Sequence, residues 1–192
     1  MAIPNALIIM HGGPATGKTT VGVPLAERFG IPYISKDGVK EPMFDSIGIP
    51  TGWPYEETLS GRKMDDASIQ ILLYLIEAQM KAGCGCVIDS TFQAPTAPAI
   101  RDLAEQYGFT PIQIVCTADV EVVAARYRSR FENNERHPGH QDKRLSDDFD
   151  AEAVAKLFKP LDIGGHMLNV DSTEFTDQDF ESLVKSVENI LN

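Results

Sequence analysis

The feature that most constrains this chain is a glycine-rich segment, GGPATGKT, which follows a short apolar run near the N-terminus. It matches the pattern G-x-x-x-x-G-K-[ST] at every fixed position from Gly12 to Thr19. Glycines let successive backbone N–H groups turn inward around a phosphate, because no Cβ obstructs them. A helix that follows such a loop adds its free N–H groups and the positive end of its dipole. The segment therefore predicts a site for the phosphates of a nucleotide.

Individual positions of this segment have expected roles toward a nucleoside triphosphate. We expect the Lys18 ammonium to reach the β- and γ-phosphates and the Thr19 hydroxyl to ligate Mg²⁺. The pattern fits ATP and also GTP. The predicted nucleotide-binding residues of the segment are Gly12, Gly13, Pro14, Ala15, Thr16, Gly17, Lys18, Thr19 and Thr20.

Short apolar runs alternate with longer amphipathic stretches through the chain. Strands are predicted at Ala6–Met10, Pro32–Ser35, Cys84–Ile88, Pro111–Cys116 and Met167–Val170. Helices are predicted at Lys18–Phe29, Asp66–Lys81, Ala97–Tyr107, Val120–Arg130 and Asp177–Leu191. This alternation implies right-handed βαβ units and a parallel sheet with helices on both faces. The 192 residues, without repeats or linkers, are expected to form one α/β domain, 1–192.

Two segments interrupt the alternation. Residues 36–64 contain three prolines, several glycines and the single tryptophan, Trp53. Residues 131–149 contain part of a basic cluster and the sequence RHPGH. Long irregular segments in a compact domain are usually functional loops or lids. We therefore expect both segments to contribute to function.

The chain is acidic overall but locally basic. The formal net charge is −11, and from Leu145 onward there are eleven acids against three lysines. Six basic residues fall within positions 126–144, with three acids among them. Extended nucleic acid is bound through neutralisation of its phosphates, so an acidic chain is a poor match for it. A small, highly charged ligand suits a local basic cluster better.

Apolar runs and cysteines bear on where the protein works. No apolar run approaches the roughly 18 to 20 residues that a membrane-spanning helix needs, so no membrane association is expected. The stretch MAIPNALIIMHGG has no basic region before its apolar run, which favours a first strand over a signal peptide. Three cysteines show no disulfide pattern, and Cys84 and Cys86 are expected to share one face of a strand. These features favour a reducing cytoplasm.

Four features together carry a resemblance to a known family. They are GGPATGKTT after ALIIM, Asp37 after the second strand, Asp89 after the third, and an arginine-rich helix before residues 131–149. The chain resembles the P-loop kinases, and within them the AAA_33, zeta-toxin-like and chloramphenicol phosphotransferase-like proteins. The resemblance implies a three-layer fold whose five-stranded parallel sheet has the order 2-3-1-4-5. It also implies transfer of the γ-phosphoryl group of Mg-ATP to a hydroxyl of a small molecule, with residues 36–64 binding that acceptor and residues 131–149 forming a lid.

Two aspartates are candidates for the chemistry of such a kinase. Asp89 matches the position that holds Mg²⁺ beside Thr19, and its alternative role is to cap the segment that follows its strand. Asp37 matches the position that accepts or orients the proton of the acceptor hydroxyl. The alternative for Asp37 is an ordinary helix N-cap, because it precedes Gly38 and a short predicted helix.

The arginine-rich helix supplies candidates for neutralising the transferred phosphoryl group. Arg126 and Arg130 are four residues apart and share a helix face. The resemblance assigns these two arginines, with Lys18, to catalysis, because their charges would oppose the charge on the phosphoryl oxygens. Arg136 is expected to reach the nucleotide from the lid. The alternative for all three arginines is a charged helix face paired with nearby glutamates.

Four residues near these candidates have more than one interpretation. Lys36 and Lys40 either hold an anionic substrate or belong to the solvated surface. His137 and His140 flank Pro-Gly, and they either form a structural turn, touch the substrate from a lid, or ligate a metal. No carboxylate or cysteine close in sequence completes a metal site, which disfavours the last interpretation.

The acceptor itself is less constrained by the sequence. The aromatic residues Phe44, Trp53 and Tyr55 either stack on a ring-bearing acceptor or form a small core of their own. Residues 171–173 follow the fifth strand, where related proteins place a loop beside adenine. A polynucleotide 5′-hydroxyl kinase, and a regulatory ATPase or GTPase without an acceptor, are alternative functions. The sequence indicates neither the acceptor nor an oligomeric state.

Overall fold

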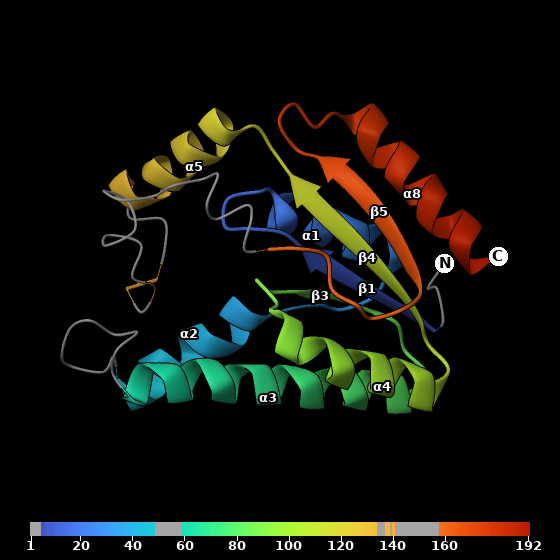
Figure 1. The fold of residues 1–192 in the computed structure, drawn as a ribbon, viewed down its shortest axis with the longest axis horizontal. Coiled ribbons are helices and arrows are strands. Elements are labelled where there is room, and N and C mark those ends of the chain that lie inside the picture. The colour runs from blue at the N-terminus through green and yellow to red at the C-terminus, as the bar shows by residue number, and fades with distance from the viewer. Residues whose placement is uncertain (1–4, 49–58, 134–136, 139, 141–157) are drawn as a thin grey trace.

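The structure is a computed structural model that describes residues 5–48, 59–133, 137–138, 140 and 158–192. Its described strands form one parallel sheet in the order β2-β3-β1-β4-β5, which confirms the predicted order (Figure 1). The strands are β1 Ala6–His11, β2 Tyr33–Ser35, β3 Cys86–Asp89, β4 Thr110–Thr117 and β5 His166–Asp171. Each lies within two residues of its predicted position at either end.

Helices cover both faces of the sheet, which gives three layers (Figure 1). Helices α1 and α8 pack on one face, and α3 and α4 pack on the other. The described helices are α1 Lys18–Phe29, α2 Lys36–Ile47, α3 Leu59–Lys81, α4 Ala97–Tyr107, α5 Val120–Glu132 and α8 Asp177–Leu191, with a short 3-10 helix, Ala94–Thr96, before α4. No helix among the described residues is long and apolar enough to cross a membrane.

The central strand β1 shows why the sheet is buried on both sides. Its side chains alternate between the two layers, with Ile8 and Met10 in the core under α1 and α8 and with Leu7 and Ile9 in the core under α3 and α4. A continuous apolar run is what a parallel strand covered on both faces requires. Because β1 pairs with β3 and with β4, the ends of these three strands meet at one edge of the sheet. Ligand sites of open parallel sheets form at this carboxyl edge.

The segment between β2 and α3 differs from the prediction. The sequence predicted an irregular insertion at 36–64 with a short helix after Asp37, whereas α2 begins directly after β2 and runs to Ile47, and α3 begins seven residues before its predicted start. Ser35 caps α2 by accepting a hydrogen bond from the Gly38 amide at 2.9 Å, so Asp37 is not the N-cap. Phe44 is buried against Met64, which confirms the interpretation of this aromatic as part of a small core. Trp53 and Tyr55 lie outside the described residues.

The cysteines are all free, but one of them was wrongly placed in a strand. The prediction put Cys84 and Cys86 on the same face of one strand, whereas β3 begins at Cys86. Cys86 is buried in the sheet, whereas Cys84 is exposed in the connection before it. The two residues before Cys86 follow a turn at residues 82–83 that connects α3 to the sheet, which the apolar character of the sequence did not reveal.

Candidate functional site

The glycine-rich loop connects β1 to α1 at the centre of the carboxyl edge of the sheet. Gly12 and Gly17 both have positive φ, 137° and 80°, where an L side chain is strained. A Cβ on Gly12 would overlap the carbonyl oxygen of Cys116 in β4, and one on Gly17 would lie 2.7 Å from Ser172 Oγ after β5. Both glycines of the pattern are therefore required by the neighbouring strands as well as by a phosphate.

Lys18 is held against its own loop. Its Nζ donates hydrogen bonds to the carbonyl oxygens of Gly12 and Gly13 at 3.0 and 2.7 Å. Burial lowers the pKa of the Lys18 ammonium, and the negative charge of Asp89 acts in the opposite direction. The structure thus places the lysine and Asp89 in one electrostatic environment, as the predicted phosphate and metal site requires.

Three residues from three elements meet at one carboxylate oxygen. The hydroxyl of Thr19 in α1 donates to Asp89 Oδ2 at 3.1 Å, and the hydroxyl of Tyr33 in β2 donates to the same oxygen. Asp89 is buried at the end of β3. Burial, and then the charge of Asp89, raise the pKa of Tyr33 above its usual value, so the phenol keeps its proton and its role as donor.

This donor set fits Mg²⁺. Hydroxyl and carboxylate oxygens are the ligands that this hard cation prefers, and it usually binds through one or two protein ligands together with phosphate oxygens. The described residues contain no group of three or more histidine, cysteine, aspartate or glutamate side chains that could hold a metal. A cation between Thr19 and Asp89 would therefore draw its other ligands from a bound nucleotide and from water.

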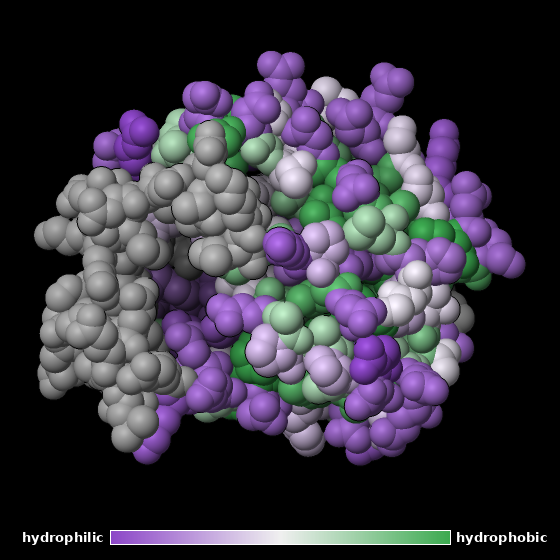
Figure 2. All heavy atoms as spheres, in the orientation of Figure 1, coloured by the Kyte–Doolittle hydropathy of each residue, from purple (hydrophilic) through white to green (hydrophobic). Residues whose placement is uncertain are grey.

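A cavity of about 540 Å³ opens beside the loop. Its wall is formed by the loop, by the start of α2, by the end of β3 and by α5, and it includes Asp37, Asp89 and Arg130. Figure 2 shows a hollow with hydrophilic residues along its wall on the face seen there. Ser90 Oγ in the same wall is buried and has no hydrogen-bond partner among the described residues. Asp37, the second residue of α2, and the glycine-rich loop thus border the same space, although most of α1 and all of β2 lie between them in the sequence.

The two arginines predicted for catalysis lie on the same side of α5 but have different surroundings. Arg126 donates from Nη1 to Ser172 Oγ at 3.0 Å and from Nη2 to the Ser172 carbonyl oxygen at 2.6 Å. Ser172 Oγ in turn donates to the Thr16 carbonyl oxygen at 3.0 Å. Arg130 lines both the 540 Å³ cavity and a second cavity of about 590 Å³ between α1, α5 and the residues after β5.

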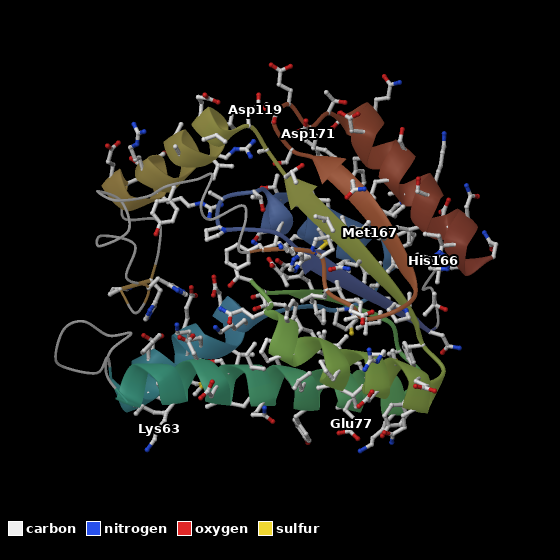
Figure 3. The ribbon with its side chains drawn as sticks, viewed as in Figure 1. Lys63, Glu77, Asp119, His166, Met167 and Asp171 are labelled. Atoms are coloured by element: carbon white, nitrogen blue, oxygen red, sulfur yellow. The ribbon has the colours of Figure 1, made fainter. Side chains whose placement is uncertain are left out.

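Sequence reasoning missed the connection through Ser172. Figure 3 shows Asp171, at the end of β5, near Asp119, which follows β4 at the same edge of the sheet. The second cavity lies beside this edge and beside Gly17, so residues 171–173 border the space next to the loop. Proximity to adenine stays a prediction for these residues. Arg136 lies outside the described residues, as does most of the predicted lid 131–149.

Two described histidines of the predicted lid contact α2. His137 Nε2 lies 3.0 Å from Asp45 Oδ1, and its ring stacks on Phe44 with 6.0 Å between centroids. His140 Nε2 lies 2.9 Å from Glu41 Oε1, and His140 lines the 540 Å³ cavity. The two histidines are three residues apart, and their carboxylate partners are four residues apart on one face of α2. This similar spacing lets each histidine contact one carboxylate.

The two lysines of α2 share one carboxylate from α3. Lys36 Nζ and Lys40 Nζ lie 2.7 and 2.8 Å from Asp65 Oδ1. Although burial by itself raises the pKa of Asp65, the two lysines outweigh it and hold that pKa below its usual value. Neither lysine belongs to the solvated surface, because the Lys40 side chain is 9% exposed and the Lys36 side chain 19% exposed. Asp65 gave no signal in the sequence beyond being an acid in a long amphipathic helix.

His11, which the sequence gave no role, is fully buried at the end of β1. Its Nε2 lies 2.8 Å from the Lys159 carbonyl oxygen, whereas Nδ1 has no hydrogen-bond partner among the described residues. Burial lowers the pKa of His11 below its usual value. The residue therefore fastens the chain before β5 to the start of the glycine-rich loop, as a neutral imidazole.

Comparison with known families accounts for this arrangement. The family model AAA_33, described as an AAA domain, matches residues 7–151. The chain belongs to the AAA_33 family. The matched range holds the glycine-rich loop, Asp37, Asp89 and the two arginines predicted for catalysis, Arg126 and Arg130. An uncharacterized protein of Mycobacterium bovis and two of Mycobacterium tuberculosis are each 30% identical over 131 residues, or 67% of this chain. The match spans 26% of the length of these relatives.

Solved structures agree with the AAA_33 assignment. A protein from Chloroflexus aurantiacus, described as a candidate kinase, is 34% identical, with a TM-score of 0.83 over 99% of this chain and all of its own. A sugar kinase from Janibacter is 17% identical, with a TM-score of 0.63 over 96% and 95% of the two chains. Shikimate kinase from Acinetobacter baumannii, solved with shikimate, is 18% identical, with a TM-score of 0.51 over 98% and 93%. The last two share the fold, and this AAA_33 chain has the P-loop kinase fold that the sequence predicted.

Proposed function

We propose that this AAA_33 protein is a kinase that moves the γ-phosphoryl group of Mg-ATP to a hydroxyl of a small molecule. The observation that carries the proposal is the 540 Å³ cavity, which the glycine-rich loop, Asp89 and Asp37 all border. Donor and acceptor would therefore share one space. The kinase descriptions of the Chloroflexus and Janibacter proteins support the same reaction class.

The residues of the cavity suggest how the transfer proceeds. The acceptor oxygen attacks the γ-phosphorus, the bond from that phosphorus to the bridging oxygen breaks, and ADP leaves. Asp37 accepts the proton of the acceptor hydroxyl. Lys18 and Arg130 oppose the negative charge of the phosphoryl oxygens. Mg²⁺ bound at Thr19 and Asp89 supplies further positive charge to the phosphates.

The proposal extends to the whole chain and to its surroundings. We infer that residues 1–192 act as one kinase domain, because helices α1 and α8, from opposite ends of the chain, cover the same face of one sheet. Three free cysteines, one of them exposed, suit a reducing compartment such as the cytoplasm. The net charge of −11 favours a small acceptor over the end of a polynucleotide.

The test is a screen for acceptor-dependent ADP release. The protein is incubated with Mg-ATP and a broad panel of hydroxyl compounds that includes a 5′-hydroxyl oligonucleotide, and products are checked by mass for one added phosphate. We expect one class of small compound to raise ADP release many-fold. Asp37→Asn should remove this increase while nucleotide still binds, and Lys18→Ala should weaken both binding and turnover.

Two results would contradict the proposal. Phosphorylation of the oligonucleotide in place of every small compound would indicate a polynucleotide kinase. ADP release that no compound changes, and that Asp37→Asn leaves intact, would indicate a nucleotide hydrolase without an acceptor.

A further inference from the structure

The two lysines at the acceptor end of the cavity already share one carboxylate of the protein. Lys36 and Lys40 lie in its wall, on the first two turns of α2. Both ammonium groups contact one oxygen of Asp65, at 2.7 and 2.8 Å. Helix α2 packs against α3 to make this contact, as Figure 1 shows. Lys40 also lies over the Phe44 ring, 5.4 Å from its centroid, which restricts its movement away from Asp65.

A carboxylate on an acceptor would compete with Asp65 for the same two ammonium groups. To bind them it must separate charge pairs whose side chains are mostly buried, where hydrogen bonds between charges are strong. It would also leave the Asp65 carboxylate close to a second negative charge. The built-in carboxylate therefore acts against an acidic acceptor.

The other charged groups of this wall add to that effect. Asp37 and Glu41, on the same part of α2, are both acids. The other cations of the wall, Lys18 and Arg130, are those that the proposed function assigns to the phosphates of ATP. Hydroxyl groups complete the acceptor wall, among them that of Ser90, which is buried and has no partner among the described residues.

A groove of about 870 Å³ adjoins the cavity and shares Lys36 and Thr91 with it. Its polar side chains include Asp65, Asp66 and two glutamines, with several apolar residues between them. Lys36 is the sole cation among the described residues that line this groove, and it is paired with Asp65. An acceptor too long for the cavity would thus extend along acids, amides and apolar surface.

We propose that the acceptor is a hydroxyl compound without a carboxylate or phosphate group, either uncharged or carrying an amine, and that Asp65 makes this selection. The proposal rests on the proposed kinase function. In this proposal Asp65 determines the specificity for the acceptor through Lys36 and Lys40, and it does not touch the reacting atoms.

The experiment compares acceptors that differ in one group. Glucose, glucosamine and glucuronate form one set, and shikimate and gluconate add two unrelated acids. We expect the wild type to prefer neutral or amine-bearing members, with kcat/KM for the matched acid lower by at least about tenfold, the equivalent of one charge-assisted hydrogen bond. Asp65→Asn should reduce this difference by freeing both lysines, and Asp65→Glu should restore it.

A matched control separates this effect from a general change in charge. Asp66→Asn removes one acid from the next position of α3, which lines the groove but has no ion pair with the two lysines in the described structure. It should leave the ratio between neutral and acidic acceptors unchanged. Melting temperatures of all variants show whether Asp65→Asn still folds, and Asp65→Ser provides a second removal of the charge.

A binding measurement keeps this inference distinct from the proposed function. With a non-hydrolysable ATP analogue and Mg²⁺ bound, calorimetry measures shikimate and gluconate binding to the wild type and to Asp65→Asn. We expect binding to the variant that exceeds binding to the wild type. Equal binding to both proteins, or binding to neither, would overturn the role of Asp65. Failure of every compound to be phosphorylated would contradict the kinase function, while this comparison would still decide the selection.

Discussion

The hydroxyl of Thr19 donates a hydrogen bond to Asp89 Oδ2 at 3.1 Å, across 70 positions of the sequence. Thr19 is the second residue of α1, directly after the glycine-rich loop, and the order of the sheet brings the end of β3 beside it. In the proposed function, these two oxygens would hold a magnesium ion beside the nucleotide. The consequences of this pairing can be measured.

Removing the Thr19 hydroxyl should weaken magnesium binding without unfolding the protein. Thr19→Ala is expected to raise the Mg²⁺ concentration for half-maximal turnover by about tenfold or more, because a ligand oxygen is lost. Thr19→Ser keeps the hydroxyl and should remain close to the wild type. Titration of ADP release with Mg²⁺ measures both variants, and an unchanged midpoint in Thr19→Ala would contradict the metal role.

Tyr33 is expected to position the Asp89 carboxylate. Tyr33→Phe removes the second donor to Oδ2 and should raise the Mg²⁺ midpoint by about tenfold, the effect typical of groups that orient a metal ligand. Tyr107→Phe is the matched control, because it also removes a phenol that donates to a carboxylate, that of Glu77 at 2.8 Å, away from the cavity. If both variants shift the midpoint equally, the positioning role is wrong.

Ser172 and Arg130 should affect different kinetic constants. Ser172→Ala removes the Oγ contacts to Arg126 and to the Thr16 carbonyl, so KM for ATP should rise by roughly fivefold to tenfold, as for one lost hydrogen bond. Arg130→Ala should instead lower kcat by about 100-fold, because it removes charge facing the phosphoryl group.

Steady-state kinetics with saturating acceptor separates these two effects. Ser186→Ala, which removes a serine hydroxyl bonded to a backbone carbonyl on α8, is the control for Ser172→Ala. A fall in kcat with unchanged KM in Ser172→Ala would count against its assignment to nucleotide binding.

Burial of His11 should make the protein less stable in acid. Because burial lowers the pKa of His11, the unfolded chain binds more protons than the folded one as the pH falls below about 6.5. Stability should be unaffected by this group above that pH and should then fall by up to about 1.4 kcal/mol for each pH unit, until the folded histidine is itself protonated.

His11→Asn should lose less stability than the wild type over the same range, because its amide takes up no proton there, while it can still donate to the Lys159 carbonyl oxygen. Urea unfolding at about pH 7.5 and about pH 5.5 gives the two free energies of unfolding for each protein. His166→Asn, at an exposed position at the far end of β5 (Figure 3), is the matched control. An equal loss in wild type and His11→Asn would show that His11 does not contribute.

The parts of the fold that the sequence could predict are those indicated by patterns of neighbouring residues. Helix α1 has its predicted bounds because the features that begin and end it, the glycine-rich loop and Gly30, lie directly next to it in the sequence. The sequence predicted only a short helix after Asp37, because Gly38 and Pro42, which both lie within α2, are typical of a loop. The stability of α2 comes from packing on α3 and from Ser35 at its N-terminus, and packing has no signature in a short stretch of sequence.

The candidate site divides in the same way. The sequence by itself determined the loop from Gly12 to Thr19, because the spacing of glycine, lysine and threonine is set by the geometry of a phosphate. Only the tertiary structure decided that Tyr33, Ser172 and Asp65 contact residues of the candidate site. The order of the strands and the packing of α2 on α3 bring these residues to partners that are distant in the sequence. The residues next to each of them in the sequence therefore give no indication of the contact.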